Sequence, residues 1–119
     1  MFPFNTPTDF LEYIKKMDSN TQNCPISYCL DLISGKWELK ILFYLFKYDT
    51  LRFGALKKQL PGITNTVLTN TLKKFEKAGI IDRTQYNEIP PHVKYSLNES
   101  GKEVIHVFFE LAKWAHHIH

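Results

Sequence analysis

The chain has 119 residues, of which 44% are hydrophobic and 23% charged, and its formal net charge is +3. This length suits one domain, near the size at which a partner subunit often helps to bury apolar surface, and it excludes a multidomain enzyme. The composition excludes a disordered chain and a uniformly polybasic one. The charge is unevenly spread, because residues 34–96 hold 11 basic and 5 acidic side chains, whereas the two flanks together hold 4 and 7. A basic middle section of net +6 therefore lies between acidic ends of net −3.

Neither a signal peptide nor a membrane span is expected. The N-terminus lacks a basic segment followed by a long apolar run. The longest apolar stretches, such as residues 41–46, are far shorter than the roughly 20 residues that cross a bilayer. We expect a cytoplasmic chain without a membrane partner. Its two cysteines, five positions apart, do not form a disulfide framework and are expected to be free thiols.

Turn signals divide the first half of the chain into short helices. A first helix is expected over residues 8–17, with Thr8 as its N-cap. A second is expected over residues 25–33, because proline suits the first turn of a helix, and this places Cys24 at or near the N-cap. After Ser34-Gly35, a third helix is expected over residues 36–47, with Trp37, Ile41, Tyr44 and Leu45 as its core-facing stripe.

Two further helices and a hairpin follow. A short helix is expected over residues 53–60, ended by Pro61-Gly62. Thr64 then caps a helix that reaches residue 78, with Gly79 as its left-handed stop. Extended segments are expected over residues 80–86 and 93–97, joined by a proline-stiffened tip at residues 87–91.

The last helix is expected from its cap at Asn98 to residue 116. Its apolar residues form two adjacent rows, which make a wider stripe than the core of a small domain needs. Burial in the core of the same chain would explain these rows, but the small size of the chain favours packing on a second subunit. The rows are Val104, Phe108, Leu111 and Ala115, and Ile105, Phe109 and Ala112.

The order of short helix, Pro-Gly turn, second helix and hairpin is that of a helix-turn-helix followed by a wing, whose second helix enters the major groove of DNA. On a helical wheel, residues 64–78 place hydroxyl, amide and ammonium groups, but no acid, opposite Leu68, Leu72 and Phe75. Such residues are also common on solvated helices, but the motif order favours DNA. The residues expected to contact bases are Thr66, Thr69 and Asn70. Those expected to contact phosphates are Arg52, Lys57, Lys73, Lys77 and Lys94, with Asn65 in either role.

The basic surplus is concentrated in the same motif. Residues 50–80 carry 6 basic side chains, Arg52, Lys57, Lys58, Lys73, Lys74 and Lys77, against the single acid Glu76, a net +5. A protein-binding helix would expose apolar or aromatic residues at these positions instead.

Several short motifs agree with one another in spacing: Cys24-Pro25, Gly35-Lys36-Trp37, Arg52-Phe53, Leu60-Pro61-Gly62-Ile63 and Pro90-Pro91-His92-Val93-Lys94-Tyr95-Ser96-Leu97. From about residue 24 to 114 the chain resembles the HxlR-type winged-helix transcription regulators. The resemblance implies a homodimer, formed through the N-terminal helices and the last helix, that binds inverted repeats in DNA. It also implies that the thiol at Cys24 senses electrophiles, aldehydes or oxidants.

The position of Cys24 also favours a reactive thiol on physical grounds, independently of the family resemblance. A thiol at a helix N-terminus is stabilised as the reactive thiolate by the helix dipole. The alternative is a small buried apolar residue, a common position for free cysteines. Cys29 lies about 140° further round the same helix, so a disulfide with Cys24 is not expected. Because Cys29 stands between Tyr28 and Leu30, it is expected in the core, and a disulfide between two subunits stays open as the alternative. His116, His117 and His119 are expected to be a solvated tail without metal.

The sequence therefore predicts a mainly α fold with a small β-hairpin wing, a winged helix-turn-helix with extra N-terminal and C-terminal dimerisation helices. One domain is expected over residues 1–119, with an extension at 1–23, a core at 24–97 and a dimerisation helix at 98–119. Without a phosphate loop, metal spacing or nucleophile motif, no enzyme, cofactor or metal is expected.

The expected partners are double-stranded DNA, a second copy of the chain, and an electrophile, oxidant or small-molecule effector. The expected function is a sequence-specific transcription regulator that reads a pseudo-palindromic operator and is switched at Cys24. Two alternatives stay open. One is a winged-helix adaptor or antirepressor that binds proteins, and the other is a DNA-binding regulator controlled by a non-covalent ligand.

Overall fold

The computed structural model describes residues 2–16 and 25–119, without the side chain of Pro25. The chain forms two compact units, Met1–Asp31 and Leu32–His119. No helix in the described parts of the chain combines the length and the hydropathy that a membrane span requires.

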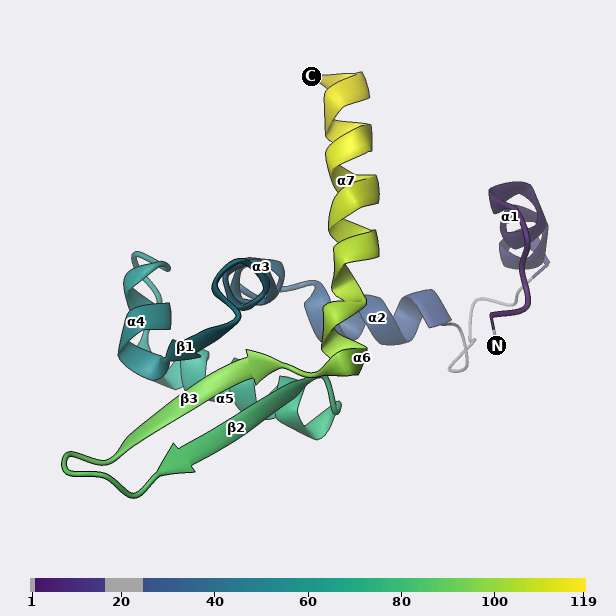
Figure 1. Cartoon of the computed structure of the whole chain (residues 1–119). Coiled ribbons are helices and arrows are strands. Elements are labelled where there is room, and N and C mark those ends of the chain that lie inside the picture. Colours follow the sequence, from purple (N-terminus) through teal and green to yellow (C-terminus); the bar gives the residue numbers. More distant parts are fainter. Residues whose placement is uncertain (1, 17–24) are drawn as a thin grey trace. The chain divides into compact units, whose positions relative to one another are not determined.

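The first unit begins with helix α1 (Pro7–Lys15) (Figure 1). Its N-cap is Thr6, whose Oγ1 accepts a hydrogen bond from the backbone N–H of Asp9 at 3.1 Å. The expected cap at Thr8 was therefore wrong by two positions. The reason is Pro7, which biases the preceding residue toward extended backbone and itself fits the first helical position. The expected end of this helix at Met17 lies outside the described residues.

Helix α2 (Pro25–Ile33) has the predicted bounds. Cys29 is exposed on it, which corrects the expectation that this thiol lies in the core. The neighbouring Tyr28 and Leu30 are exposed as well, so this stretch of α2 is apolar in sequence but is not buried within its unit. An apolar neighbourhood in sequence indicates burial only where another element covers it.

The second unit contains a three-stranded antiparallel sheet in the order β1-β3-β2. Strand β1 was not predicted, because three residues are too few to show alternation, and it is recognised only by its pairing of Leu51 with Tyr95 on β3. The elements are α3 (Glu38–Tyr48), β1 (Thr50–Arg52), α4 (Phe53–Lys58), α5 (Asn65–Lys77), β2 (Ile81–Tyr86), β3 (His92–Leu97), α6 (Glu99–Lys102) and α7 (Val104–Ile118).

The core of this unit lies between α3, α4, α5 and one face of the sheet. It confirms Ile41 and Leu45 on α3 and the predicted inner face of α5, whereas Trp37 and Tyr44 are only partly buried against it. Its members are Ile41, Leu42, Leu45, Leu56, Leu60, Ile63, Leu68, Leu72, Phe75, Ile81 and Leu97.

Asn98 joins the end of α5 to the start of α6. Its side-chain Oδ1 accepts the N–H of Gly101 at 2.9 Å, its Nδ2 donates to the carbonyl of Gly79 at 2.7 Å, and its backbone N–H donates to the carbonyl of Ile80 at 3.2 Å. A Cβ on Gly101 would collide with the Ile80 carbonyl oxygen, so the close approach requires glycine. The predicted cap is confirmed, but the last helix is interrupted at Glu103, which separates α6 from α7.

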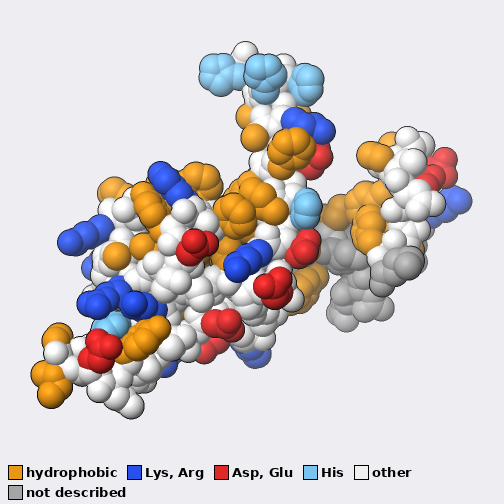
Figure 2. Space-filling view, viewed as in Figure 1, with side chains coloured by type: hydrophobic (Ala, Val, Ile, Leu, Met, Phe, Trp, Pro, Cys, Tyr) orange, Lys and Arg blue, Asp and Glu red, His pale blue; other side chains and the backbone are white. Residues whose placement is uncertain are grey.

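No residue of α7 is fully buried. Val104 and Phe108 pack partly against the core, while much of the apolar surface beyond them faces outward, and Figure 2 shows hydrophobic side chains along this helix. Trp114 is 62% exposed. The other large exposed hydrophobic residues of α7 are Ile105, Val107, Phe109, Leu111 and Ile118.

The left-handed stop of α5 gives a stability prediction. Gly79 has φ +78°, and no atom lies within 4 Å of the place where a Cβ would be. Gly79→Ala is therefore expected to lower the free energy of unfolding by about 1–2 kcal/mol through backbone strain alone. The matched control is Gly54→Ala in α4, where the space is equally open and φ is not positive. This change should raise the free energy of unfolding by about 0.5–1 kcal/mol. Urea denaturation measures both, and equal losses at the two positions would contradict the strain argument.

Candidate nucleic-acid interface

Helix α5 is fixed at both ends and on its inner face. At its start, Oγ1 of Thr64 accepts the N–H of Val67 at 3.1 Å, as the predicted N-cap requires. Leu68, Leu72 and Phe75 are fully buried, so the inner face of the predicted wheel is confirmed. These contacts determine which side of α5 is left for solvent or a ligand.

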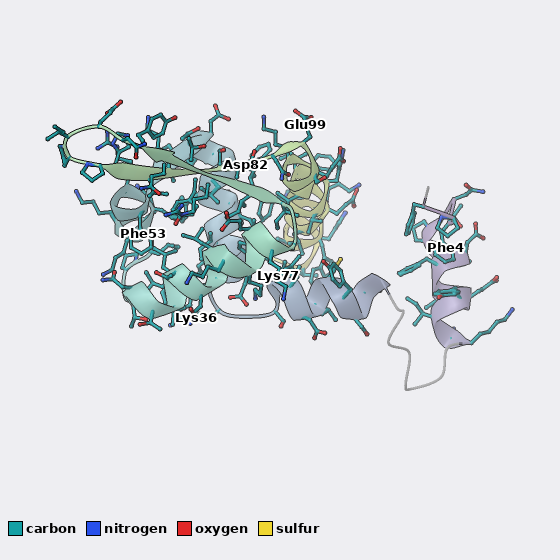
Figure 3. All side chains as sticks on the ribbon, turned by 90° about the horizontal axis from the view of Figure 1, so that it is seen from below. Phe4, Lys36, Phe53, Lys77, Asp82 and Glu99 are labelled. Atoms are coloured by element: carbon teal, nitrogen blue, oxygen red, sulfur yellow. The ribbon has the colours of Figure 1, made fainter. Side chains whose placement is uncertain are left out.

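The outward side of α5 carries the predicted polar residues. Thr66, Asn70, Lys73 and Lys77 are exposed, as is Asn65 at the start of the helix, whereas Thr69 is half-buried. These six side chains of α5 are called the helix group below. Figure 3 shows α5, with Lys77 labelled, on one side and the sheet, with Asp82 labelled, on another. The helix group contains no carboxylate, so it can donate hydrogen bonds and offer positive charge to an anionic partner.

Arg52 and Lys94 lie on a different surface. They are directly paired across β1 and β3, so their side chains lie on the same face of the sheet. The neighbouring pair, Leu51 and Tyr95, packs against the core, so Arg52 and Lys94 point away from it and from α5. Two like charges opposite one another destabilise a strand pair, and a bound anion would relieve this. The structure therefore separates these two cations from the helix group.

Lys57 is half-buried on α4 and joins neither surface by an ion pair among the described residues. Figure 2 shows several Lys and Arg side chains gathered over α4, beside the part of the hairpin that lies toward its tip.

Lys74 is neutralised by a residue that sequence reasoning missed. Its Nζ lies 3.1 Å from Oε2 of Glu38, at the start of α3. The same carboxylate oxygen accepts the N–H of Gly35 at 2.9 Å, and the side chain of Glu38 is only 12% exposed. No local signal connects positions 36 residues apart in the chain. Of the net +5 counted for residues 50–80, one charge is therefore balanced inside the unit.

The wing has an ordered aromatic side. The rings of Tyr86 and His92 stack at 4.8 Å, and Nζ of Lys94 lies 5.0 Å from the centroid of the Tyr86 ring. Nδ1 of His92 lies 3.7 Å from a carboxylate oxygen of Glu88. At the tip, the Ile89–Pro90 peptide bond is cis, and Ile89 is fully exposed. The predicted hairpin and its tip are confirmed.

Two other candidate sites are the predicted sensor thiol and the C-terminal histidines. Cys24, the predicted sensor thiol, lies outside the described residues. His116 and His117 have their rings 6.3 Å apart near the end of α7. Within residues 2–16 and 25–119, no three His, Cys, Asp or Glu side chains are grouped as metal ligands.

Comparison with known proteins agrees with this geometry. The family model described as HxlR-like helix-turn-helix matches residues 32–119. An HTH-type transcriptional regulator of Halalkalibacterium halodurans is 37% identical over 103 residues, which cover 87% of this chain and 90% of that protein.

Among solved structures, the HTH-type transcriptional regulator ytcD has a TM-score of 0.74 and 36% identity, with 80% of this chain and 97% of that one covered. The redox regulator HypR in its oxidised form has a TM-score of 0.70 and 32% identity, with 78% and 95% covered. The chain therefore belongs to the HxlR-like helix-turn-helix family of DNA-binding transcriptional regulators.

Proposed function

We propose that the chain is a sequence-specific regulator that binds a pseudo-palindromic DNA operator as a homodimer. The observation that carries this proposal is the outward side of α5, where polar and cationic side chains outnumber the single exposed acid, Glu76, while the inner side of the helix is buried. A helix with this division fits the major groove, where base edges offer hydrogen-bond partners.

The helix group divides by chemistry and exposure. Asn70 is the main base reader, because an exposed amide can form two hydrogen bonds with the N6 and N7 atoms of adenine. Thr66 can bond a base or contact a thymine methyl group, and the half-buried Thr69 has less reach. Lys73 and Lys77 extend to phosphates, and Asn65 contacts either. Arg52, Lys57 and Lys94 are proposed to contact the flanking DNA backbone.

A second copy of the chain is proposed to cover α7. The helix exposes Ile105, Phe109 and Trp114, and apolar surface of this kind is typical of a protein interface. A two-fold dimer places its two recognition helices about 34 Å apart, one turn of B-DNA. The operator is then an inverted repeat whose half-sites are about one turn apart.

Selection of bound sequences from random duplex DNA tests this proposal. The expected product is an inverted repeat with that spacing, bound by two chains. A single unrepeated motif would contradict the dimer. No enrichment by the folded protein would contradict sequence-specific binding and would favour the protein-binding adaptor.

We further propose that modification of Cys24 changes DNA binding. The structural similarity to a redox regulator supports a thiol switch, and Cys24 directly precedes the first residue of α2. Cys24→Ser is expected to abolish any change in DNA affinity caused by an electrophile or an oxidant. Cys29→Ser, at the exposed cysteine of the same helix, is the control and should respond like the wild type. Gel-shift titrations with and without diamide measure both, and an undiminished response of Cys24→Ser rules this thiol out.

A further inference from the structure

A pocket of about 560 Å³ opens between α3, the turn from α4 to α5, and α7. Its volume lies within the range of small-molecule sites. The apolar walls come from three parts of the fold: Phe43 of α3 with its N-cap Trp37, Leu60 and Pro61 in the turn, and Phe108 and Leu111 on α7. The rings of Phe43 and Phe108 meet edge to face at 5.8 Å, so α3 and α7 are in contact at this side of the pocket.

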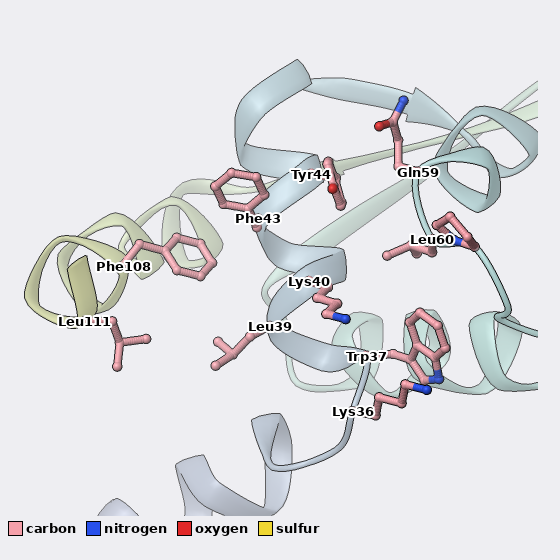
Figure 4. Close-up of a pocket in the computed structure, with 11 residues that line it drawn as sticks. Lys36, Trp37, Leu39, Lys40, Phe43, Tyr44, Gln59, Leu60, Phe108 and Leu111 are labelled. Carbon is pink, nitrogen blue, oxygen red and sulfur yellow. The ribbon is translucent and has the colours of Figure 1, made fainter. Parts of the chain in front are cut away.

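The polar part of the pocket is cationic. Nζ of Lys36 lies 4.9 Å from the centroid of the Trp37 ring, and Nζ of Lys40 lies 5.4 Å from the same ring. Figure 4 shows both ammonium groups beside the indole, at one end of the pocket, with Phe108 and Leu111 at the other. The described residues offer neither lysine an ion pair, and no carboxylate lines the pocket. Glu38, the nearest acid in sequence, is held by Gly35 and Lys74 instead.

We propose that this pocket binds a small organic anion with an apolar body, most simply an aryl-alkyl carboxylate. The carboxylate is held by Lys36 and Lys40, and the apolar body lies against Trp37, Phe43 and Phe108. Both lysines are exposed, so an anion can reach them from solvent. Two ammonium groups that share one indole repel one another, and a single anion relieves this repulsion.

The pocket is also placed to affect DNA binding, a consequence that rests on the proposed function. Leu60 and Pro61 belong to the turn that leads into the Thr64 cap of α5. The edge of the Trp37 ring lies 3.9 Å from where a Cβ on Gly62 would be, so the indole abuts this turn. A bound anion neutralises two cations beside the start of the recognition helix. The ligand is therefore expected to weaken DNA binding, and DNA to weaken ligand binding by the same factor.

Fluorescence of Trp37 tests ligand binding without DNA. In a Trp114→Phe background, the emission of Trp37 is followed during titration with 4-phenylbutyrate and with the neutral 4-phenylbutan-1-ol. The acid is expected to bind with saturable 1:1 behaviour and at least about tenfold more tightly than the alcohol, as charge-assisted hydrogen bonds require. Lys40→Met and Lys36→Met each keep the apolar stem and should lower the affinity for the acid by several-fold or more. The matched control, Lys58→Met, removes an exposed lysine of α4 that does not line the pocket and should change nothing.

Three results would overturn the proposal: no saturable change in Trp37 emission with the acid, equal affinity for acid and alcohol, or unchanged affinity in both pocket variants. A fourth result would also overturn it, by assigning the two lysines to DNA binding. If Lys36→Met and Lys40→Met reduce the slope of log DNA affinity against log salt in ligand-free protein, as loss of a phosphate contact would, the two lysines contact the DNA backbone and not the anion. Failure of the proposed function is distinguishable, because it would appear as absent DNA binding while the fluorescence titration still succeeds.

Discussion

Phe75→Ala is expected to lower the free energy of unfolding by about 3–5 kcal/mol. Phe75 is 0% exposed and lies in the core with Leu68 and Leu72 from the same face of α5. The cost combines the lost burial of the ring with the cavity that it leaves. Because small domains are stable by only about 5–15 kcal/mol in total, this single change removes a large part of the stability. Urea denaturation followed by circular dichroism measures it.

Val67→Ala is the control for this prediction. Val67 lies on the same helix but is 37% exposed, so its truncation removes fewer buried contacts. We expect a change of less than about 1 kcal/mol, partly offset by the better helix propensity of alanine. Comparable losses for the two variants would mean that the inner face of α5 does not anchor the recognition helix.

Asn70→Ala is expected to weaken binding to the selected operator by about 1–3 kcal/mol, which corresponds to roughly 5- to 150-fold, and to relax specificity at one base pair. The amide is exposed on the outward side of α5, and nothing inside the unit depends on it. Binding to scrambled DNA should change little. Fluorescence anisotropy with matched cognate and scrambled duplexes measures both affinities, and an equal loss on both would show that Asn70 reads no base.

Lys73→Ala separates base reading from phosphate contact. Lys73 is exposed three residues further along α5, on the same side of the helix. Its loss should weaken cognate and scrambled DNA alike and reduce the slope of log affinity against log salt by about one unit. An unchanged slope would remove Lys73 from the phosphate contacts.

The recognition helix and the wing were predictable because their signals are local. Thr64 and Gly79 mark the two ends of α5 within its own sequence, and the spacing of Leu68, Leu72 and Phe75 defines its buried face. The proline-stiffened tip separates two strands that then pair in register from Ile81 with Leu97 to Tyr86 with His92. In these segments, local propensity and tertiary packing favour the same structure.

The features that were missed depend on distant partners. Strand β1 exists because β3 pairs with it, and the ion pair between Glu38 and Lys74 joins residues of different helices. The division of the cations into a helix surface and a sheet surface follows from the side of the sheet that carries Arg52 and Lys94. A linear count of charge contains no information about which face each charge occupies.

Asn98 connects the end of the recognition helix α5 to the start of the C-terminal helices. Its hydrogen bonds hold the carbonyls of Gly79 and Ile80, just beyond the end of α5, and Gly101 leaves no gap between α6 and the Ile80 carbonyl. Only Glu103, in nearly helical backbone, separates α6 from α7. A partner that binds the outer part of α7 and shifts this helix is therefore expected to change the orientation of α5 through the same connection. In the proposed dimer, the angle at which two chains meet through α7 therefore sets the angle and the spacing of their two α5 helices.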